Sequence, residues 1–251
     1  MIMPRRVVFE GAKFSHELNL ANTGSDSANY VISLVHYRMK EDGSIEEMAA
    51  DDSSGNFADP YVRIFPRRVT LAPNEAQSVR IQLTQTKNLA NGEYRSHLYF
   101  RAVPNNTALG EKETTNAGAT GISVQIKPVF GIAIPVIIRA GEATTKVGLA
   151  NCSFEMLDAN TPILKMTLLR TGNMSAYGDI TVDHISPIGK VTRVGIIKGL
   201  AVYTPNEMRH VKMSINEIEG VDYTRGKLHI IYQAQENANY TNTAQSEVYL
   251  N

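Results

Sequence analysis

ISVQIKPVFGIAIPVIIR, from Ile122 to Arg139, is the stretch that decides the fold of this chain. Its first part alternates apolar residues with Ser, Gln and Lys, whereas its last part is almost uniformly apolar. Such alternation indicates a strand that has one face available for another contact. Pro128 and Pro135 cannot donate a hydrogen bond to a neighbouring strand, so we expect this segment at a sheet edge or changing partner at the prolines. Because an apolar edge strand promotes aggregation, the sequence predicts that the edge is either covered or used.

The composition is that of an ordinary globular protein. The 251 residues include 25 basic and 25 acidic side chains, and 43% are hydrophobic. This length allows one large domain or two of ordinary size. Zero net charge gives no electrostatic reason to expect nucleic acid or an anionic membrane as a partner. Lys127, Gly131 and the prolines interrupt the longest apolar run, so no membrane insertion is expected. The first residues contain no secretory leader, so we expect either a cytoplasmic protein or one whose signal peptide has been removed.

The strand pattern predicts an all-β protein. Short runs rich in Val, Ile, Tyr and Thr recur between turn signals such as NTGSDS and APNE, and helical periodicity is almost absent. The two halves also resemble each other: LNLANTG, VTLAPNEAQSVRIQL and GEYRSHLYF are followed, in the same order, by MTLLRTG, LAVYTPNEMRHVKMSI and TRGKLHIIY. We therefore predict two β-sandwich domains, residues 1–140 and 141–251, with the seam in RAGEATT.

Motifs for catalysis and metal binding are missing. The six histidines are scattered, and the chain contains no HExxH, no Cys/His cluster, no GxSxG and no P-loop. The lone Cys152 excludes an intramolecular disulfide and is expected to be buried. His97 alternates with Arg95 and Tyr99 and is expected at an exposed strand position. The acidic residues of segment 41–60 are interpreted as a solvated loop, with a calcium site as the alternative. We predict no enzyme activity, no metal and no cofactor.

Four segments, in this order, resemble the periplasmic chaperones of the chaperone/usher pilus pathway: RRVVFEG, FPRRVTLAPNEAQSVRIQL, GEYRSHLYFRAVP and the run that ends in VIIR. VDYTRGKLHIIY is similar to a segment late in the second domain of that family. The resemblance implies two immunoglobulin-like β-sandwich domains joined in a boomerang. It also implies a pilus or fimbrial subunit and an outer-membrane usher as partners, and a location in the periplasm.

The resemblance gives the alternating run a role in binding. In this family the chaperone supplies a strand to a subunit that lacks its own last strand, which is known as donor-strand complementation. Ile122, Val124, Ile126 and Phe130 would then enter the groove of the subunit while the backbone forms ladder hydrogen bonds. The alternative is that these residues pack inside the first sandwich of this protein, with no partner.

The resemblance also implies an anchor for the subunit. In the family, an arginine on an N-terminal strand and a lysine on the last strand of the first domain bind the C-terminal carboxylate of the subunit. Arg6 matches the arginine, and its guanidinium suits a carboxylate because it can donate two parallel hydrogen bonds. The lysine position falls near Pro135, where this sequence departs from the pattern. Lys127 lies several residues upstream and could substitute only in a different register.

Glu93, Arg139 and Asp222 match an interdomain ionic cluster of the family. Two carboxylates around one arginine suit a partly buried hinge, because a buried charge must be paired. We expect a structural role; the alternative is that each is an isolated surface charge. For the protein as a whole, the alternative is an adhesin or sugar-binding β-sandwich, which the absence of Trp disfavours, and an enzyme ranks third.

Overall fold

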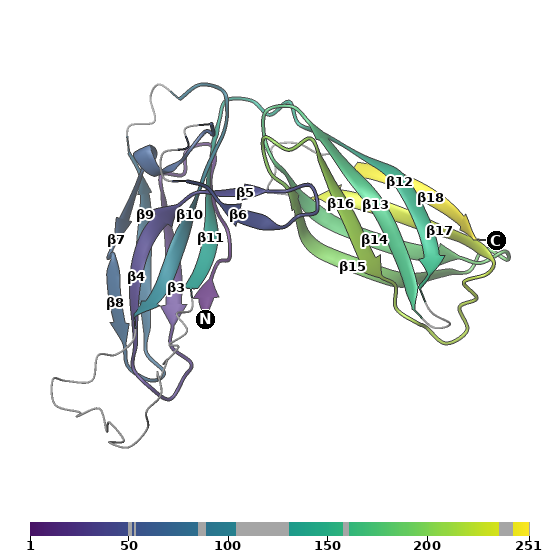
Figure 1. The fold of residues 1–251 in the computed structure, drawn as a ribbon, viewed down its shortest axis with the longest axis horizontal. Helices are drawn as coiled ribbons and strands as arrows, with labels where there is room; N and C mark the ends of the chain where they lie inside the picture. Colours follow the sequence, from purple (N-terminus) through teal and green to yellow (C-terminus); the bar gives the residue numbers. More distant parts are fainter. Residues whose placement is uncertain are drawn as a thin grey trace, which may run out of the picture. The chain divides into compact units, whose positions relative to one another are not determined.

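The computed structural model describes residues 1–49, 52, 54–84, 89–103, 131–157, 161–235 and 243–250. These residues form an all-β protein, as predicted, and their one helical element is a single 3-10 turn, η1 (Asp59–Tyr61) (Figure 1). No helix in the described part of the chain is long and apolar enough to cross a membrane. The chain divides into two compact units, and each is described by itself. The first unit contains Met1–His36, Asn56–Asn88 and Tyr94–Ile138, and the second contains Tyr37–Gly55, Leu89–Glu93 and Arg139–Asn251.

The first unit is a sandwich of two sheets. One sheet contains, in spatial order, β1 (Ile2–Met3), β3 (Ser15–Ala21), β9 (Ala76–Leu83) and β7 (Val62–Phe65). The other contains β2 (Val7–Phe9), β11 (Gly131–Ala140), β10 (Gly92–Val103), β4 (Ala28–Val35) and β8 (Arg68–Leu71). Alternate residues of each strand face the core, because successive side chains of a strand point to opposite sides. Leu18 and Leu20 of β3 and Leu98 and Phe100 of β10 are accordingly almost completely buried.

The second unit has the seven strands of an immunoglobulin-like sandwich. One sheet contains β12 (Lys146–Met156), β13 (Pro162–Thr171) and β16 (Met208–Ser214). The other contains β15 (Val191–Val202), β14 (Ala176–Ile185), β17 (Gly226–Ala234) and β18 (Thr243–Leu250). The apolar residues between the sheets form one core, in which Leu164, Ile180 and Tyr232 are fully buried.

The pairing of strands confirms the internal repeat. The order β11-β10-β4-β8 in the first unit corresponds to β18-β17-β14-β15 in the second, and the pair β3-β9 corresponds to β13-β16. The three repeated segments fall on equivalent strands: β3 and β13, then β8–β9 and β15–β16, then β10 and β17. The two halves therefore share the topology of these strands and differ in their edge strands.

The second unit also takes a hairpin from the first half of the sequence. This hairpin consists of β5 (Tyr37–Met39) and β6 (Ile45–Glu47). The backbone oxygen of Glu41 accepts a hydrogen bond of 2.6 Å from the His210 N–H, at the edge of β16. The Asn206 side chain donates a bond of 2.8 Å to the oxygen of Met39. Because of these contacts, the two units are not separated by the single division at residue 140 that the sequence predicts. The last segment of the second unit begins at Arg139.

Candidate functional site

Five of the residues expected to bind a subunit lie outside the described residues. These are Ile122, Val124, Ile126, Lys127 and Phe130. Their role stays a prediction from the sequence. The structure describes the continuation of their run, which is β11, and the strand that carries the expected anchor, which is β2.

β11 is a core strand for most of its length. Ile134, Val136 and Ile138 alternate along it and are at most 3% exposed. Ile132 lies on the same side of the strand but is 52% exposed. The apolar last part of the run is therefore a core strand from Ile134 onward, whereas Ile132 lies outside the core. The three residues of β2 pair only with Val136–Ile138, so the first half of β11 extends beyond this neighbour.

Arg6 directly precedes β2 and lies close to the position where the resemblance expects a lysine. β2 runs parallel to β11, with Val7 opposite Val136. Extending this register by one residue places the backbone of Arg6 beside Pro135. The Arg6 side chain is partly buried. The structure therefore brings the candidate anchor to the β11 edge, with a proline at the neighbouring position.

His16 holds β2 from the opposite sheet. Its Nε2 lies 2.8 Å from the carbonyl oxygen of Val8, and since a carbonyl only accepts, Nε2 carries the donated proton. The His16 ring also meets the Phe9 ring edge to face, with centroids 4.8 Å apart. Burial lowers the pKa of His16, and the charge of Lys13 acts in the same direction. Sequence reasoning missed His16, because its position in an alternating strand carries no motif.

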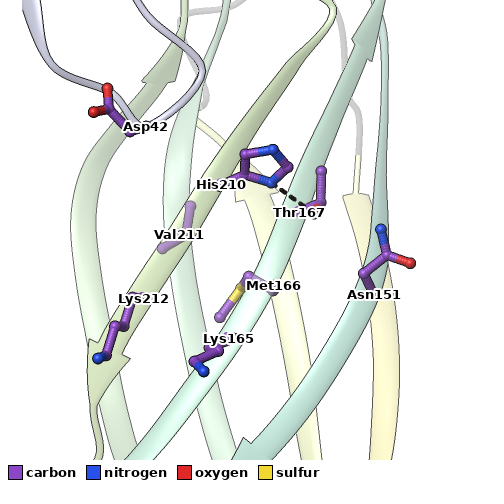
Figure 2. Close-up of a pocket in the computed structure, with 8 residues that line it drawn as sticks. All are labelled: Asp42, Asn151, Lys165, Met166, Thr167, His210, Val211 and Lys212. Atoms are coloured by element: carbon purple, nitrogen blue, oxygen red, sulfur yellow. Dashed lines mark hydrogen bonds between the residues drawn. The ribbon is translucent and has the colours of Figure 1, made fainter.

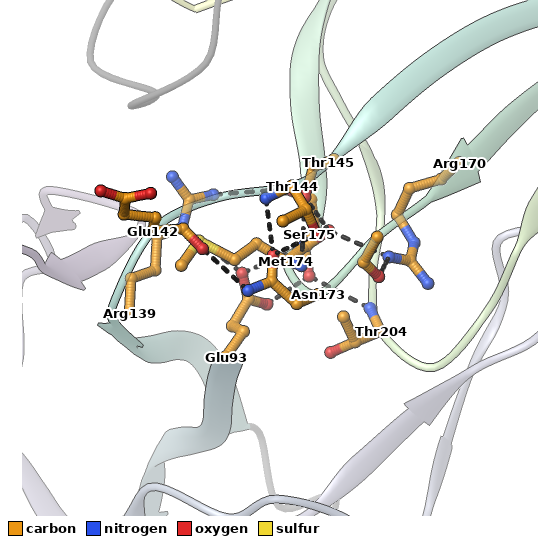
Figure 3. A network of polar contacts seen from close by, with 11 residues as sticks. Glu93, Arg139, Glu142, Thr144, Thr145, Arg170, Asn173, Met174, Ser175 and Thr204 are labelled. Carbon is orange, nitrogen blue, oxygen red and sulfur yellow. Dashed lines mark hydrogen bonds and ion pairs between the residues drawn. The ribbon is translucent and has the colours of Figure 1, made fainter. Parts of the chain in front are cut away.

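Glu93 and Arg139 form a buried ion pair in the second unit (Figure 3). Arg139 Nε lies 3.4 Å from Glu93 Oε2, and the two residues are 8% and 2% exposed. Ser175 completes the site. Its N–H donates to Glu93 Oε2 at 3.0 Å, its hydroxyl donates to Glu93 Oε1, and its carbonyl oxygen accepts from Arg139 Nη2 at 3.3 Å. The Thr204 N–H donates to the Ser175 hydroxyl oxygen at 3.1 Å. Every charged atom of the carboxylate is thus compensated.

Asp222, expected as the third charged member, does not join this pair. Its Oδ1 accepts bonds from the Thr224 N–H at 2.9 Å and the Thr224 hydroxyl at 2.6 Å, which lower the pKa of Asp222. Asp222 precedes β17, whose first residues pair with the last residues of β14, whereas Ser175 precedes the first residue of β14. The two ends of this strand are separated by its whole length. Ser175 therefore takes the place of the predicted second carboxylate.

Arg170 braces the turn that carries Ser175. It is 4% exposed and donates to the backbone oxygens of Gly172 at 2.8 Å and Met174 at 3.0 Å. It also donates to the oxygens of Asn206 at 2.7 Å and Pro205 at 3.3 Å. The side chain thus ties the turn before β14, drawn in Figure 3, to the turn before β16. The only signal in the sequence is a charged residue in the apolar run ILKMTLLRT.

His97 is buried in the first unit, and the expectation of an exposed position is wrong. It is 4% exposed. The segment around Asn56 runs beside β10 next to this position: the Asn56 oxygen accepts from the Arg95 N–H at 2.8 Å, and the Ser96 hydroxyl accepts from the Ala58 N–H at 3.0 Å. Burial, with smaller contributions from the charges of Arg95 and His36, lowers the pKa of His97 to about 3. His97 is therefore a neutral core residue.

A cavity of about 490 Å³ opens on the outer face of the three-stranded sheet of the second unit (Figure 2). Lys165 and Lys212 stand directly opposite each other on β13 and β16, and Thr167 stands opposite His210, with Oγ1 3.1 Å from Nδ1. Glu155 pairs with Lys165 at 2.7 Å. The lining mixes both signs of charge and includes none of the residues predicted to be functional. Cys152 is partly buried, and no group of three possible metal ligands occurs among the described residues.

Comparison with known proteins gives similarity at the level of structure. No protein-family model and no curated protein matches the sequence. The chain is similar to the Pseudomonas aeruginosa CupB2 chaperone, with 12% identity, a TM-score of 0.45 and 98% of both chains covered. It is also similar to a CsuC-CsuE chaperone-tip adhesion subunit complex of Acinetobacter baumannii, with 11% identity, a TM-score of 0.45 and coverage of 98% and 96%. A third structure is the Salmonella enterica SafA pilin in complex with the SafB chaperone, with 14% identity, a TM-score of 0.42 and coverage of 100% and 95%. The first of these structures is of a chaperone, the second is a complex from chaperone-usher Csu pili, and the third is a chaperone with a pilin.

Proposed function

We propose that this protein is a periplasmic chaperone that stabilises an incomplete pilus or fimbrial subunit by donor-strand complementation and delivers it to an outer-membrane usher. The observation that carries the proposal is the form of β11. Where this strand extends beyond its partner β2, the large apolar side chain of Ile132 is 52% exposed. The alternating run of Ile122, Val124 and Ile126 precedes it directly in the sequence.

In the proposed mechanism, the alternating apolar residues fill the groove of a subunit that lacks its last strand. Each large apolar side chain that becomes fully buried contributes roughly 1.5 to 3 kcal/mol, from which the cost of ordering the segment is subtracted. The burial of several such side chains therefore suffices to hold the subunit stably. Arg6, next to the β11 edge, would bind the C-terminal carboxylate of the subunit through charge-assisted hydrogen bonds. The role is binding and not catalysis.

The test is to place a charge on the apolar face of the alternating run that begins at Ile122. Val124→Asp or Ile126→Asp should abolish recovery of a subunit that co-purifies with the tagged chaperone from periplasmic extract of its own host, measured by mass spectrometry. Ser123→Asp and Gln125→Asp add the same charge on the opposite parity of the same segment and should retain the subunit. Equal recovery with both pairs of variants, at equal amounts of folded chaperone, would refute strand donation.

The anchor is tested separately. Arg6→Ala should weaken binding of a purified subunit, and Arg6→Lys should restore part of it, because a lysine keeps the charge but not the planar fork. Amidation of the C-terminus of the subunit should abolish the difference in affinity between the unmodified chaperone and Arg6→Ala. An unchanged affinity of Arg6→Ala for the unmodified subunit would exclude Arg6 from the site.

A further inference from the structure

Three exposed arginines lie on or next to β7 around the exposed Phe65 of the first unit, and a fourth, Arg68, begins the next strand, β8, in the other sheet. Phe65, the last residue of β7, is 77% exposed and faces away from the core, as does Arg63 two residues earlier. Arg80 of β9 is the cross-strand neighbour of Phe65. Arg67 and Arg68 follow Phe65 at the turn into β8 and are also exposed. We name these five residues the arginine patch.

The charge of the patch is almost uncompensated. Arg80 forms an exposed ion pair with Glu17, with Nη2 3.0 Å from Oε1. Within the described part of the chain, Arg63, Arg67 and Arg68 have no acidic partner. Four arginines and one glutamate leave an excess of positive charge here, although the whole chain carries none. Such a local excess attracts anionic groups and raises the rate of their encounter.

The patch lies on two sheet edges at once. β7 is an edge strand of the sheet β1-β3-β9-β7, and β8 is an edge strand of the sheet β2-β11-β10-β4-β8. In both sheets this is the edge opposite the one formed by β1 or β2. Figure 1 shows β7 and β8 on the side of the unit away from β11. The proposed subunit-binding strand β11 neighbours β2. The arginine patch is therefore remote from that strand and remains accessible when it is occupied.

An edge strand offers unpaired backbone donors and acceptors to an extended peptide. Charged side chains along the edge discourage pairing with neutral or basic strands, since like charges and desolvation oppose it. The same arginines favour a strand that carries carboxylates, because a guanidinium binds a carboxylate through two parallel hydrogen bonds. Phe65 adds an apolar contact beside Arg63 and Arg80 on the outer face of its sheet.

We propose that the arginine patch is a second docking site, which binds an acidic extended segment of a partner protein alongside β7. The chemistry defines the partner: carboxylates at alternate positions for Arg63 and its neighbours, and an apolar side chain against Phe65. A lipid surface would use the charge but leave the β7 backbone unpaired, so the edge position favours a peptide. This proposal uses a different edge from the proposed strand donation and does not depend on it.

The experiment measures binding of the fluorescein-labelled dodecapeptide (Glu-Thr-Val-Thr)3 to the full chain by anisotropy, with (Lys-Thr-Val-Thr)3 as the charge-reversed probe. In an extended strand this repeat places Glu and Val in turn on one face, as the positions of Arg63 and Phe65 require. The Glu peptide should bind and the Lys peptide should not. Arg63→Gln combined with Arg68→Gln should weaken binding about five- to tenfold, as expected for two rim charges. Phe65→Ser should weaken it further. Lys146→Gln combined with Lys198→Gln removes the same charge from exposed positions of the second unit and should leave binding unchanged.

Amide exchange then locates the peptide. Bound Glu peptide should slow exchange along Val62–Phe65 and leave β11 unaffected. Equal weakening by the two double variants would mean unspecific attraction and overturn the proposal. Protection at β11 in place of β7 would also overturn it. A third result would also overturn it: the Glu peptide fails to bind, whereas vesicles that contain phosphatidylglycerol bind the unmodified protein but not Arg63→Gln/Arg68→Gln.

Discussion

Glu93 and Arg139 are joined by an ion pair of 3.4 Å in which the side chains are 0% and 4% exposed. The two residues come from neighbouring strands, at the beginning of β10 and near the end of β11. Ser175 supplies a hydroxyl and two backbone groups to the pair. Because water is excluded, each charge is compensated only by this small set of partners.

Removal of one charge of the pair should be strongly destabilising. We expect Glu93→Ala to lower the free energy of unfolding by about 3 to 5 kcal/mol, because it leaves the Arg139 guanidinium buried beside an uncharged residue. The double variant Glu93→Leu/Arg139→Met should cost clearly less than the sum of the single variants. Urea unfolding monitored by tyrosine fluorescence measures both. Glu17→Ala, which breaks the exposed pair with Arg80, is the control and should cost at most about 1 kcal/mol. Additive costs at positions 93 and 139 would contradict the coupling.

His97 should make the first unit sensitive to acid. Its pKa is about 3 when folded, below the ordinary value of 6.5. Between these values the unfolded chain binds the proton and the folded chain does not, so stability is complete above about pH 6.5 and falls as the pH approaches 3. We expect a loss of about 2 to 3 kcal/mol from His97 between pH 7 and pH 4.5.

The comparison of His97→Gln with the unmodified protein isolates this contribution, because the carboxylates titrate equally in both. The stability of His97→Gln should fall less steeply between pH 7 and pH 4.5 in urea melts. His229→Gln removes an imidazole from the second unit and controls for the substitution itself. Parallel pH profiles of His97→Gln and the unmodified protein would show that His97 takes up no proton on unfolding.

His16 should control the local opening of β2. His16→Phe keeps a ring against Phe9 but removes the donor to Val8, so one buried hydrogen bond of about 1 kcal/mol is lost. We expect amide exchange in Val7–Phe9 to become about fivefold faster, with little change in β4. His16→Gln retains a side-chain donor and should recover part of the protection. Unaltered exchange of β2 in His16→Phe would show that the ladder with β11 holds this strand unaided.

Gly43 should tolerate a side chain less well than another glycine of similar backbone conformation. Gly43 has φ +84°, and an added Cβ would meet the Arg209 guanidinium, whose Nη1 donates to the Ala201 oxygen at 2.8 Å. Gly189 has φ +82° with open space around it. Gly189→Ala should cost about 1 kcal/mol for the left-handed backbone, and Gly43→Ala about 2 kcal/mol, because it also displaces Arg209. Thermal unfolding of both variants gives the difference; equal costs would mean that Arg209 moves freely.

The fold followed from the sequence because its determinants are periodic. Alternation in segments such as SHELNLA gives the strand and its buried face directly, and the repeated order of segments gives the two sandwiches. The hairpin of Tyr37–Gly55 could not be assigned to the second unit in this way. Its attachment depends on Glu41, Met39 and Gly43 meeting residues of β16 and of the turn before it, which are distant in sequence, and no local pattern encodes such contacts.

The site was accessible to prediction only in part. The pair of Glu93 with Arg139 was predicted by matching to a family, whereas Asp222 was assigned to it wrongly and Ser175 was missed. A serine that donates to a buried carboxylate has the same sequence signature as a serine in any turn. His97 was misplaced because strand alternation predicts two faces but does not reveal that the outer face is covered at this position, where His97 is 4% exposed.

The docking of the β5–β6 hairpin has a consequence for the order of folding. Gly43 and Arg209 are separated by more than half of the chain, and contacts that close such long loops form late, because their entropic cost precedes their stabilisation. The strands β12 to β18 follow one another continuously and can assemble from nearer contacts. The hairpin would then attach to an already formed β16. We therefore expect the attachment of the hairpin to be a late event in folding, although its residues lie near the start of the chain.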